Sequence, residues 1–186
     1  MKTLDLAGLR VHTTGPAGAP AVLLCHGYGA PGDDLASFAE MLDPQEKLRW
    51  FFPEALLGVL TAEHGVAREK LVIGGFSQGA MLTTDVALRA GSPFAGLVIL
   101  SGSFLCADAW KPLMAERGAK LRVVQSHGRR DPILPFAAAE LLNEALVSSG
   151  AQAELVAHDG GHEIPPPALL AMRASLEKWL GVSLAG

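Results

Sequence analysis

Short apolar segments alternate along the chain with segments in which apolar residues recur at helical spacing. The apolar segments lie at 21–25, 50–52, 71–74, 96–100 and 121–125, and 153–158 is a further candidate strand. Strands that lack a polar face are typical of a parallel sheet that is covered by helices on both sides. The pattern therefore predicts an α/β fold with an open, mostly parallel sheet.

The segments between these strands predict amphipathic helices, each with its leucines and alanines on one face. The predicted helices are 34–42, 78–90, 136–149 and 165–180. The last begins in a proline run, which suits the first turn of a helix. Two alternating segments near the start, 3–6 and 9–13, predict an antiparallel hairpin at the edge of the sheet.

Length and composition narrow the class of protein. The chain has 186 residues, of which 49% are hydrophobic and 18% charged, so we expect one folded domain over residues 1–186. The net charge is −4 and no basic stripe is present, so nucleic acid is not an expected partner. No signal-like or membrane-spanning stretch occurs, and Cys25 and Cys106 are too few for a disulfide framework. These features favour a cytoplasmic protein.

A candidate nucleophile follows the strand at 71–74. Gly75-Phe76-Ser77-Gln78-Gly79 fits the pattern Gly-x-Ser-x-Gly between a predicted strand and a predicted helix. A sharp turn between strand and helix exposes the serine hydroxyl, and the flanking glycines remove side chains that would collide there. The alternative is a glycine-rich turn in which Ser77 only caps the helix.

A serine nucleophile needs a base, and the base needs an acid that holds it in the right tautomer. His162 follows the last predicted strand and completes the chain order serine, acid, histidine. His26 and His127 lie at strand ends, where we expect their rings to bond loop backbone. The acid is either Asp131, on the loop after 121–126, or Asp159. We favour Asp131, because an orienting carboxylate should reach the ring from a separate loop.

Backbone amides are the candidate oxyanion donors. His26-Gly27-Tyr28-Gly29 follows the first central strand and leaves its amides open, so Tyr28 N–H and Gln78 N–H are the predicted pair. His158, Asp159 and His162 imitate the spacing of metal ligands. Nothing else in the chain completes such a cluster, so no metal site is predicted.

Several stretches together resemble the bacterial phospholipase/carboxylesterase family of α/β-hydrolases, close to acyl-protein thioesterases. The matching stretches are Leu24-Cys25-His26-Gly27-Tyr28-Gly29, Phe52-Pro53-Glu54-Ala55, Gly74-Gly75-Phe76-Ser77-Gln78-Gly79-Ala80-Met81, Leu100-Ser101-Gly102, His127-Gly128 with Asp131, and Gly161-His162-Glu163. They occur in the family's order across nearly the whole chain.

The resemblance implies an α/β-hydrolase fold, a triad of Ser77, Asp131 and His162, and oxyanion amides from Tyr28 and Gln78. It further implies hydrolysis of small-molecule esters or thioesters of short to medium acyl chains, without a cofactor. Residues expected to wall the acyl site are Met81, Phe104, Ile133 and Leu134. Neither the natural acyl group nor the oligomeric state is indicated.

One departure from the family lies between Ala55 and Leu56. The family's segment there is several tens of residues longer, whereas 54–65 leaves twelve residues, about the minimum for a helical crossover. There are three explanations: the protein has a naturally open site, or it was trimmed, or the sequence omits a segment. The short crossover favours the third. The departure keeps one other function open, a non-catalytic protein that binds an apolar ligand. An acyltransferase that uses the same triad is a second alternative.

Overall fold

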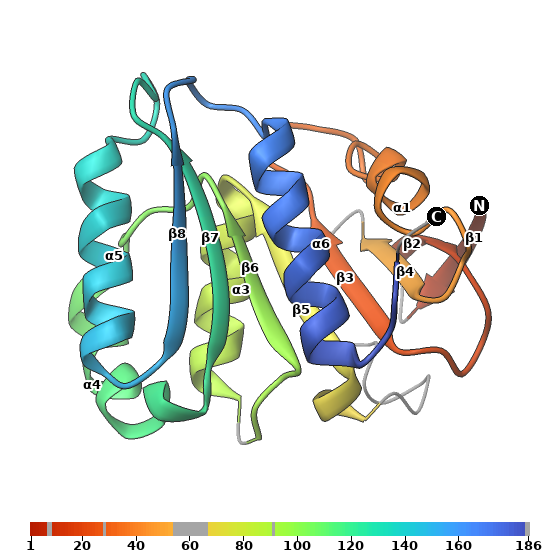
Figure 1. Ribbon diagram of the computed structural model, residues 1–186, viewed down its shortest axis with the longest axis horizontal. Coiled ribbons are helices and arrows are strands. Elements are labelled where there is room, and N and C mark those ends of the chain that lie inside the picture. The colour runs from red at the N-terminus through yellow and green to blue at the C-terminus, as the bar shows by residue number, and fades with distance from the viewer. Residues whose placement is uncertain (7–8, 28, 54–66, 91, 185–186) are drawn as a thin grey trace.

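Eight strands form one sheet in the computed structural model, which describes residues 1–6, 9–27, 29–53, 67–90 and 92–184. Their order across the sheet is β1-β2-β4-β3-β5-β6-β7-β8 (Figure 1). The strands are β1 Lys2–Leu6, β2 Leu9–Thr14, β3 Ala21–Cys25, β4 Arg49–Pro53, β5 Leu71–Phe76, β6 Gly96–Leu100, β7 Arg122–Gly128 and β8 Gln152–His158. Strands β3 to β8 are parallel to their neighbours within this set, which confirms the mostly parallel sheet.

The N-terminal hairpin is confirmed. Strand β1 pairs antiparallel with β2, with Lys2 opposite Thr13, and β2 pairs antiparallel with β4. The hairpin therefore extends the parallel sheet at one edge, and β8 forms the other edge.

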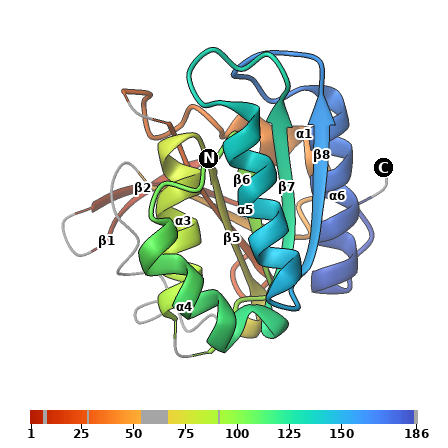
Figure 2. The same ribbon diagram turned by 90° about the vertical axis from the view of Figure 1, so that its left-hand side faces the viewer.

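Helices cover both faces of the sheet, as Figure 2 shows with the strands between them. The helices are α1 Ser37–Leu42, α3 Gln78–Arg89, α4 Ala107–Arg117, α5 Phe136–Ser148 and α6 Pro166–Leu180, with 3-10 turns η1 at Arg68–Lys70 and η2 at Gly118–Lys120. Helices α3, α4 and α5 pack in one buried cluster, and α1 and α6 pack in the other. The short crossover at 54–65 lies outside the described residues.

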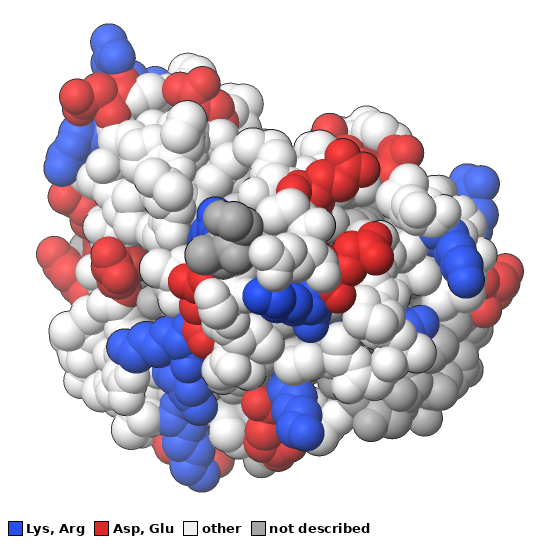
Figure 3. Space-filling model, turned by 45° about the vertical axis from the view of Figure 1, so that its right-hand side comes forward, with Lys and Arg blue, Asp and Glu red and all other residues white. Residues whose placement is uncertain are grey.

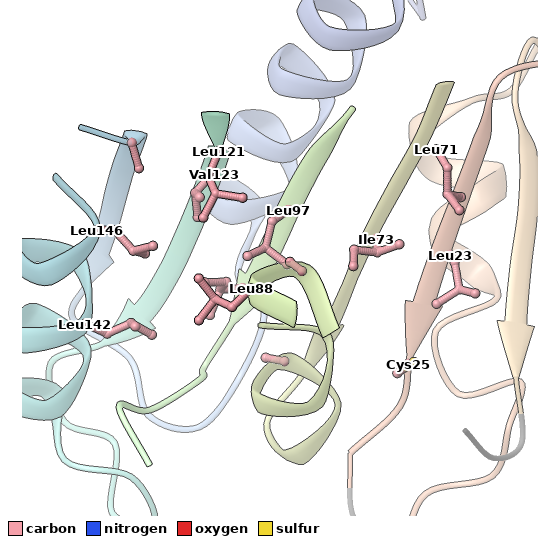
Figure 4. Packing of buried hydrophobic residues seen from close by; sticks show 14 of the residues in the cluster. Leu23, Cys25, Leu71, Ile73, Leu88, Leu97, Leu121, Val123, Leu142 and Leu146 are labelled. Atoms are coloured by element: carbon pink, nitrogen blue, oxygen red, sulfur yellow. The ribbon is translucent and has the colours of Figure 1, made fainter. Parts of the chain in front are cut away.

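Successive residues along the central strands belong alternately to the two buried clusters. Figure 4 shows Leu23, Ile73, Leu97 and Val123, from neighbouring strands, on the side of α3 and α5. The residues between them on the same strands belong to the second cluster. Every residue of β3 and β6 is buried, so these strands have no polar face, and burial on both sides fixes their position in the sheet.

Two helices differ from the prediction. Helix α1 begins at Ser37 rather than Asp34, because residues 31–36 form turns in which Asp34 N–H donates to Pro31 O and Ala36 N–H to Asp33 O. Leu35 is buried by these turns as it would be by a helix, so apolar spacing cannot separate the two. Helix α4 is not predicted by its sequence. It buries only Trp110 and Met114 and contains Pro112, so its apolar stripe is one turn long.

Charged side chains of both signs are interspersed over the described surface that Figure 3 displays. This agrees with the mixed composition of the chain. Within the described ranges, no helix has the length and apolar character required to cross a bilayer.

The two cysteines lie in different environments. Cys25 ends β3 inside a buried cluster, and burial raises the pKa of its thiol to about 12. Cys106 is exposed at the start of α4, and neither thiol forms a disulfide.

Candidate active site

Ser77 is the single residue that connects β5 to α3 in a sharp turn. Its backbone adopts φ 55° and ψ −117°, a combination that is sparsely populated for residues with a side chain and costs about 1–3 kcal/mol. Its N–H donates to Leu100 O at 2.8 Å on the neighbouring strand β6. The turn is thereby tied to the sheet, and the serine is left half-buried at the sheet's carboxyl edge.

The two glycines of the Gly-x-Ser-x-Gly pattern are required by close backbone packing. A Cβ on Gly75 would lie 2.5 Å from the Gly79 carbonyl carbon, and one on Gly79 would lie 2.3 Å from Cys25 O and 2.6 Å from His26 O. Real Cβ atoms do not approach backbone so closely. The first turn of α3 therefore packs directly against the end of β3 and the loop that follows it.

This packing leaves one of the two predicted oxyanion donors unbonded among the described residues. Gln78 N–H opens α3 and has no hydrogen-bond acceptor among the described residues, and the positive end of the helix dipole adds to its field. Gly27 lies beside the serine, since a Cβ there would be 3.6 Å from Ser77 Cβ. Tyr28, the other predicted donor, lies outside the described residues.

Asp131 and His162 meet although 31 positions separate them. Asp131 Oδ2 accepts a hydrogen bond from His162 Nδ1 at 2.7 Å. The loop after β7 supplies the carboxylate, and the loop after β8 supplies the ring. Because Nδ1 carries the proton of this bond, Nε2 of the neutral ring is left as a proton acceptor.

The carboxylate of Asp131 is completely buried, yet it stays ionised. Burial raises its pKa, but N–H donors outweigh that cost and hold the pKa below its usual value. The donors are the backbone of Leu134 at 2.9 Å, the His162 ring, and the backbone of Ile133 at 2.8 Å. A charged carboxylate here can stabilise a positive charge on His162.

The His162 ring packs on Phe76, the residue before Ser77. The rings of Phe76 and His162 lie 4.8 Å apart between centroids, tilted by 47°, and Phe76 directly precedes the serine. No hydrogen bond joins the Ser77 hydroxyl to His162 within the described part of the chain. Such bonds are often long in unliganded enzymes and tighten when substrate binds.

The alternative candidates Asp159, His26 and His127 make hydrogen bonds that involve backbone oxygens. The Asp159 side chain is exposed, and its backbone oxygen accepts from Arg130 Nε. The rings of His26 and His127 bond loop carbonyls, those of Gly27 and Leu134, at 2.7 Å and 2.9 Å. This is the backbone role expected of histidines at strand ends.

The residues expected to wall an acyl site are spread over three segments. Met81 on α3 and Phe104 after β6 are partly buried against the cluster on that face, and Phe104 stacks on Trp110 at 6.0 Å. Leu134 is half-buried, whereas Ile133 is 64% exposed. Ile133 therefore stands at the rim of the sheet's carboxyl edge.

Gly128 determines how closely the His162 loop approaches β7. A Cβ there would lie 2.1 Å from Gly161 O and 2.5 Å from Gly160 O. We expect Gly128→Ala to displace His162, lowering ester hydrolysis by tenfold or more and destabilising the fold by about 1–3 kcal/mol. Gly161→Ala is the matched control, because its Cβ would make only ordinary contacts, 3.7 Å or more. Equal activity in the two variants would show that this close approach does not position the ring.

His158 supports the same loop and makes its stability depend on pH. Its Nδ1 accepts the Gly160 N–H at 3.2 Å, and burial lowers the pKa of its ring below 6.5. Because the pKa of the His158 ring is lower in the folded protein than in the unfolded chain, the unfolded chain binds a proton first as the pH falls. The free energy of unfolding therefore decreases as the pH drops below 6.5.

In thermal unfolding between pH 7.5 and 5.5, we therefore expect the melting temperature of the wild type to fall further than that of His158→Asn. The asparagine keeps an acceptor near the Nδ1 position but does not titrate. Parallel pH curves for the two proteins would contradict this role.

Together these features define the class of protein. A serine in a strained turn between a central parallel strand and a helix, with an acid–histidine pair on two later loops, is the arrangement of an α/β-hydrolase. The chain belongs to the phospholipase/carboxylesterase family, whose family model matches residues 59–180. The resemblance seen in the sequence is thus confirmed.

Two curated relatives are similar in sequence. Acyl-protein thioesterase 1 of Gibberella zeae is 33% identical over 123 residues, which are 63% of this chain and 52% of that protein. Acyl-protein thioesterase 1 of Eremothecium gossypii is 33% identical over 109 residues, 56% of this chain and 46% of that protein. The chain spans about half the length of the curated relatives it matches.

Solved structures confirm the fold. Esterase PE8 superposes with a TM-score of 0.78 at 22% identity, over 92% of this chain and 99% of that one. Acyl-protein thioesterase 2 of Zea mays gives a TM-score of 0.74 at 22% identity, again over 92% and 99%.

Proposed function

We propose that the chain is a serine hydrolase that cleaves small carboxylic esters or thioesters of short to medium acyl length through an acyl-enzyme. The observation that carries the proposal is the 2.7 Å bond from His162 to a buried, ionised Asp131, next to the strained Ser77 turn. The acyl-protein thioesterases among its relatives support the choice of an acyl substrate.

In the proposed reaction, His162 Nε2 removes the proton of Ser77 while Ser77 Oγ attacks the acyl carbonyl carbon. Asp131 stabilises the imidazolium that forms, and Gln78 N–H, with Tyr28 N–H as its expected partner, binds the oxyanion. The imidazolium then protonates the departing alcohol or thiol as the carbon–oxygen or carbon–sulfur bond breaks. Water, activated by the same ring, attacks the acyl-enzyme and releases the acid and free Ser77.

Cys25 and Cys106 are both unpaired thiols, which agrees with the proposed cytoplasmic, reducing location. Nothing in the proposed reaction calls for a metal or cofactor.

The experiment is covalent labelling combined with hydrolysis. A fluorophosphonate probe should label one peptide, at Ser77, and p-nitrophenyl esters and matched thioesters from two to twelve carbons should be hydrolysed with a preference for the shorter acids. A protein that binds these esters but neither reacts with the probe nor turns over would be a ligand-binding member of the fold. Ester products formed with added alcohols, in preference to free acid, would instead make it an acyltransferase.

A further inference from the structure

His127 at the end of β7 has no part in the reaction as proposed, yet it contacts the acid. Its side chain is fully buried, with Nε2 at 2.9 Å from Leu134 O and 3.3 Å from Asp131 Oδ2. The ring packs on Phe136 at 6.1 Å, and the Arg129 guanidinium covers that phenyl ring at 4.8 Å. The imidazole is thus held at the base of the loop that carries Asp131.

The partners of the ring fix its tautomer. A carbonyl oxygen only accepts, so the 2.9 Å contact with Leu134 O requires that Nε2 carries a hydrogen. Nδ1 is buried and has no hydrogen-bond partner in the part of the chain that the structure describes. A second proton there would be a buried donor without an acceptor, which is unfavourable. The bond to Leu134 O therefore assigns the Nε2–H tautomer to His127, and Asp131 Oδ2 lies 3.3 Å from the same nitrogen.

The two oxygens of Asp131 are then held from two sides. Oδ1 accepts from the amides of Ile133 and Leu134, which fixes its position within the loop. Oδ2 accepts a hydrogen bond from His162 Nδ1 at 2.7 Å and lies 3.3 Å from His127 Nε2. Rotation of the carboxylate would break contacts at both oxygens.

We propose that His127 is a positioning residue of the triad: its Nε2–H donates to the Leu134 carbonyl and its Nε2 lies 3.3 Å from Asp131 Oδ2, so the ring aims the carboxylate at His162. The inference rests on the proposed function for its effect on turnover. The geometry it describes is independent of turnover.

The first test uses the wild-type protein, with histidine labelled by nitrogen-15. The His127 ring should give the signature of a neutral Nε2–H tautomer, with Nδ1 unprotonated, and the His162 Nδ1–H should give a far-downfield proton resonance. An Nδ1–H tautomer or a doubly protonated His127 near neutral pH overturns the proposal. This measurement needs no variant to fold and no substrate to turn over.

The second test compares His127→Gln with His127→Leu. Glutamine can place an N–H near the Nε2 position, whereas leucine fills the space without a donor. Since a net hydrogen bond is worth about three- to tenfold in an equilibrium or rate, we expect His127→Leu to lower kcat by about that factor with KM within twofold. It should also shift the His162 Nδ1–H resonance, and His127→Gln should restore both.

A merely structural role predicts a different result. Both variants would then lose activity in proportion to their melting temperatures, with the His162 resonance unmoved, and this would overturn the proposal. If no variant or wild type hydrolyses any ester while the resonances behave as expected, the proposed function fails and the positioning role stands.

Discussion

Replacing Ser77 with alanine is expected to lower kcat for p-nitrophenyl ester hydrolysis by about 10⁴-fold or more, because it removes the atom that we propose forms the acyl-enzyme. Alanine and serine share a Cβ, so the strain at φ 55° is the same in both. The melting temperature should therefore change little, and the loss of rate can be attributed to the missing hydroxyl rather than to unfolding. The measurement is burst and steady-state release of p-nitrophenol, with mass spectrometry for the trapped acyl-enzyme.

Ser103→Ala is the control for this prediction. Ser103 lies on the loop after β6, at the same edge of the sheet, and its variant should keep activity within twofold. If Ser77→Ala retained more than about one per cent of the wild-type rate, another group would be the nucleophile, and the assignment of the turn would be wrong.

Asp131→Asn is expected to lower kcat by about 10⁴-fold for a different reason. The asparagine oxygen can still accept the amides of Ile133 and Leu134, which leaves its NH₂ opposite His162 Nδ1. Two donors cannot face each other, so the ring takes the tautomer with its proton on Nε2, where it cannot accept the proton of Ser77. The variant should lose the far-downfield His162 resonance.

The matched control for the acid is Asp159→Asn. Asp159 was the alternative acid on the sequence, but its side chain is exposed and its known contact uses the backbone oxygen. We expect this variant to hydrolyse esters within twofold of the wild type. A severe loss in Asp159→Asn together with a mild one in Asp131→Asn would reverse the assignment.

The sheet could be predicted because its central strands are buried on both faces. Segments such as 21–25 and 96–100 are buried at every position, and only a strand covered on both faces uses apolar residues so uniformly. Helix α4 could not be predicted, since two buried residues and an internal proline do not make a helical pattern. Its position comes from packing of Trp110 against α3, where the indole donates to Asp85 at 2.9 Å.

The site could be predicted only in part. Chain order and the loops after β7 and β8 led to the choice of Asp131 and His162, whose side chains form a 2.7 Å hydrogen bond. Their catalytic roles stay a prediction. The contact of His127 with Asp131 was not foreseen, because it depends on how the loop turns. Asp131 Oδ1 binds the amides of Ile133 and Leu134 and so folds the loop back over the ring. Spacing along the chain carries no signal of that turn.

The contrast between the two thiols makes the protein easy to label at one point. With a pKa of about 12, Cys25 supplies almost no thiolate at neutral pH, whereas Cys106 is exposed where α4 begins. A maleimide dye should therefore attach at Cys106 without any engineered cysteine. Because this position follows the loop that leaves the carboxyl end of β6, the dye would report on ligands arriving at that rim by its change in emission.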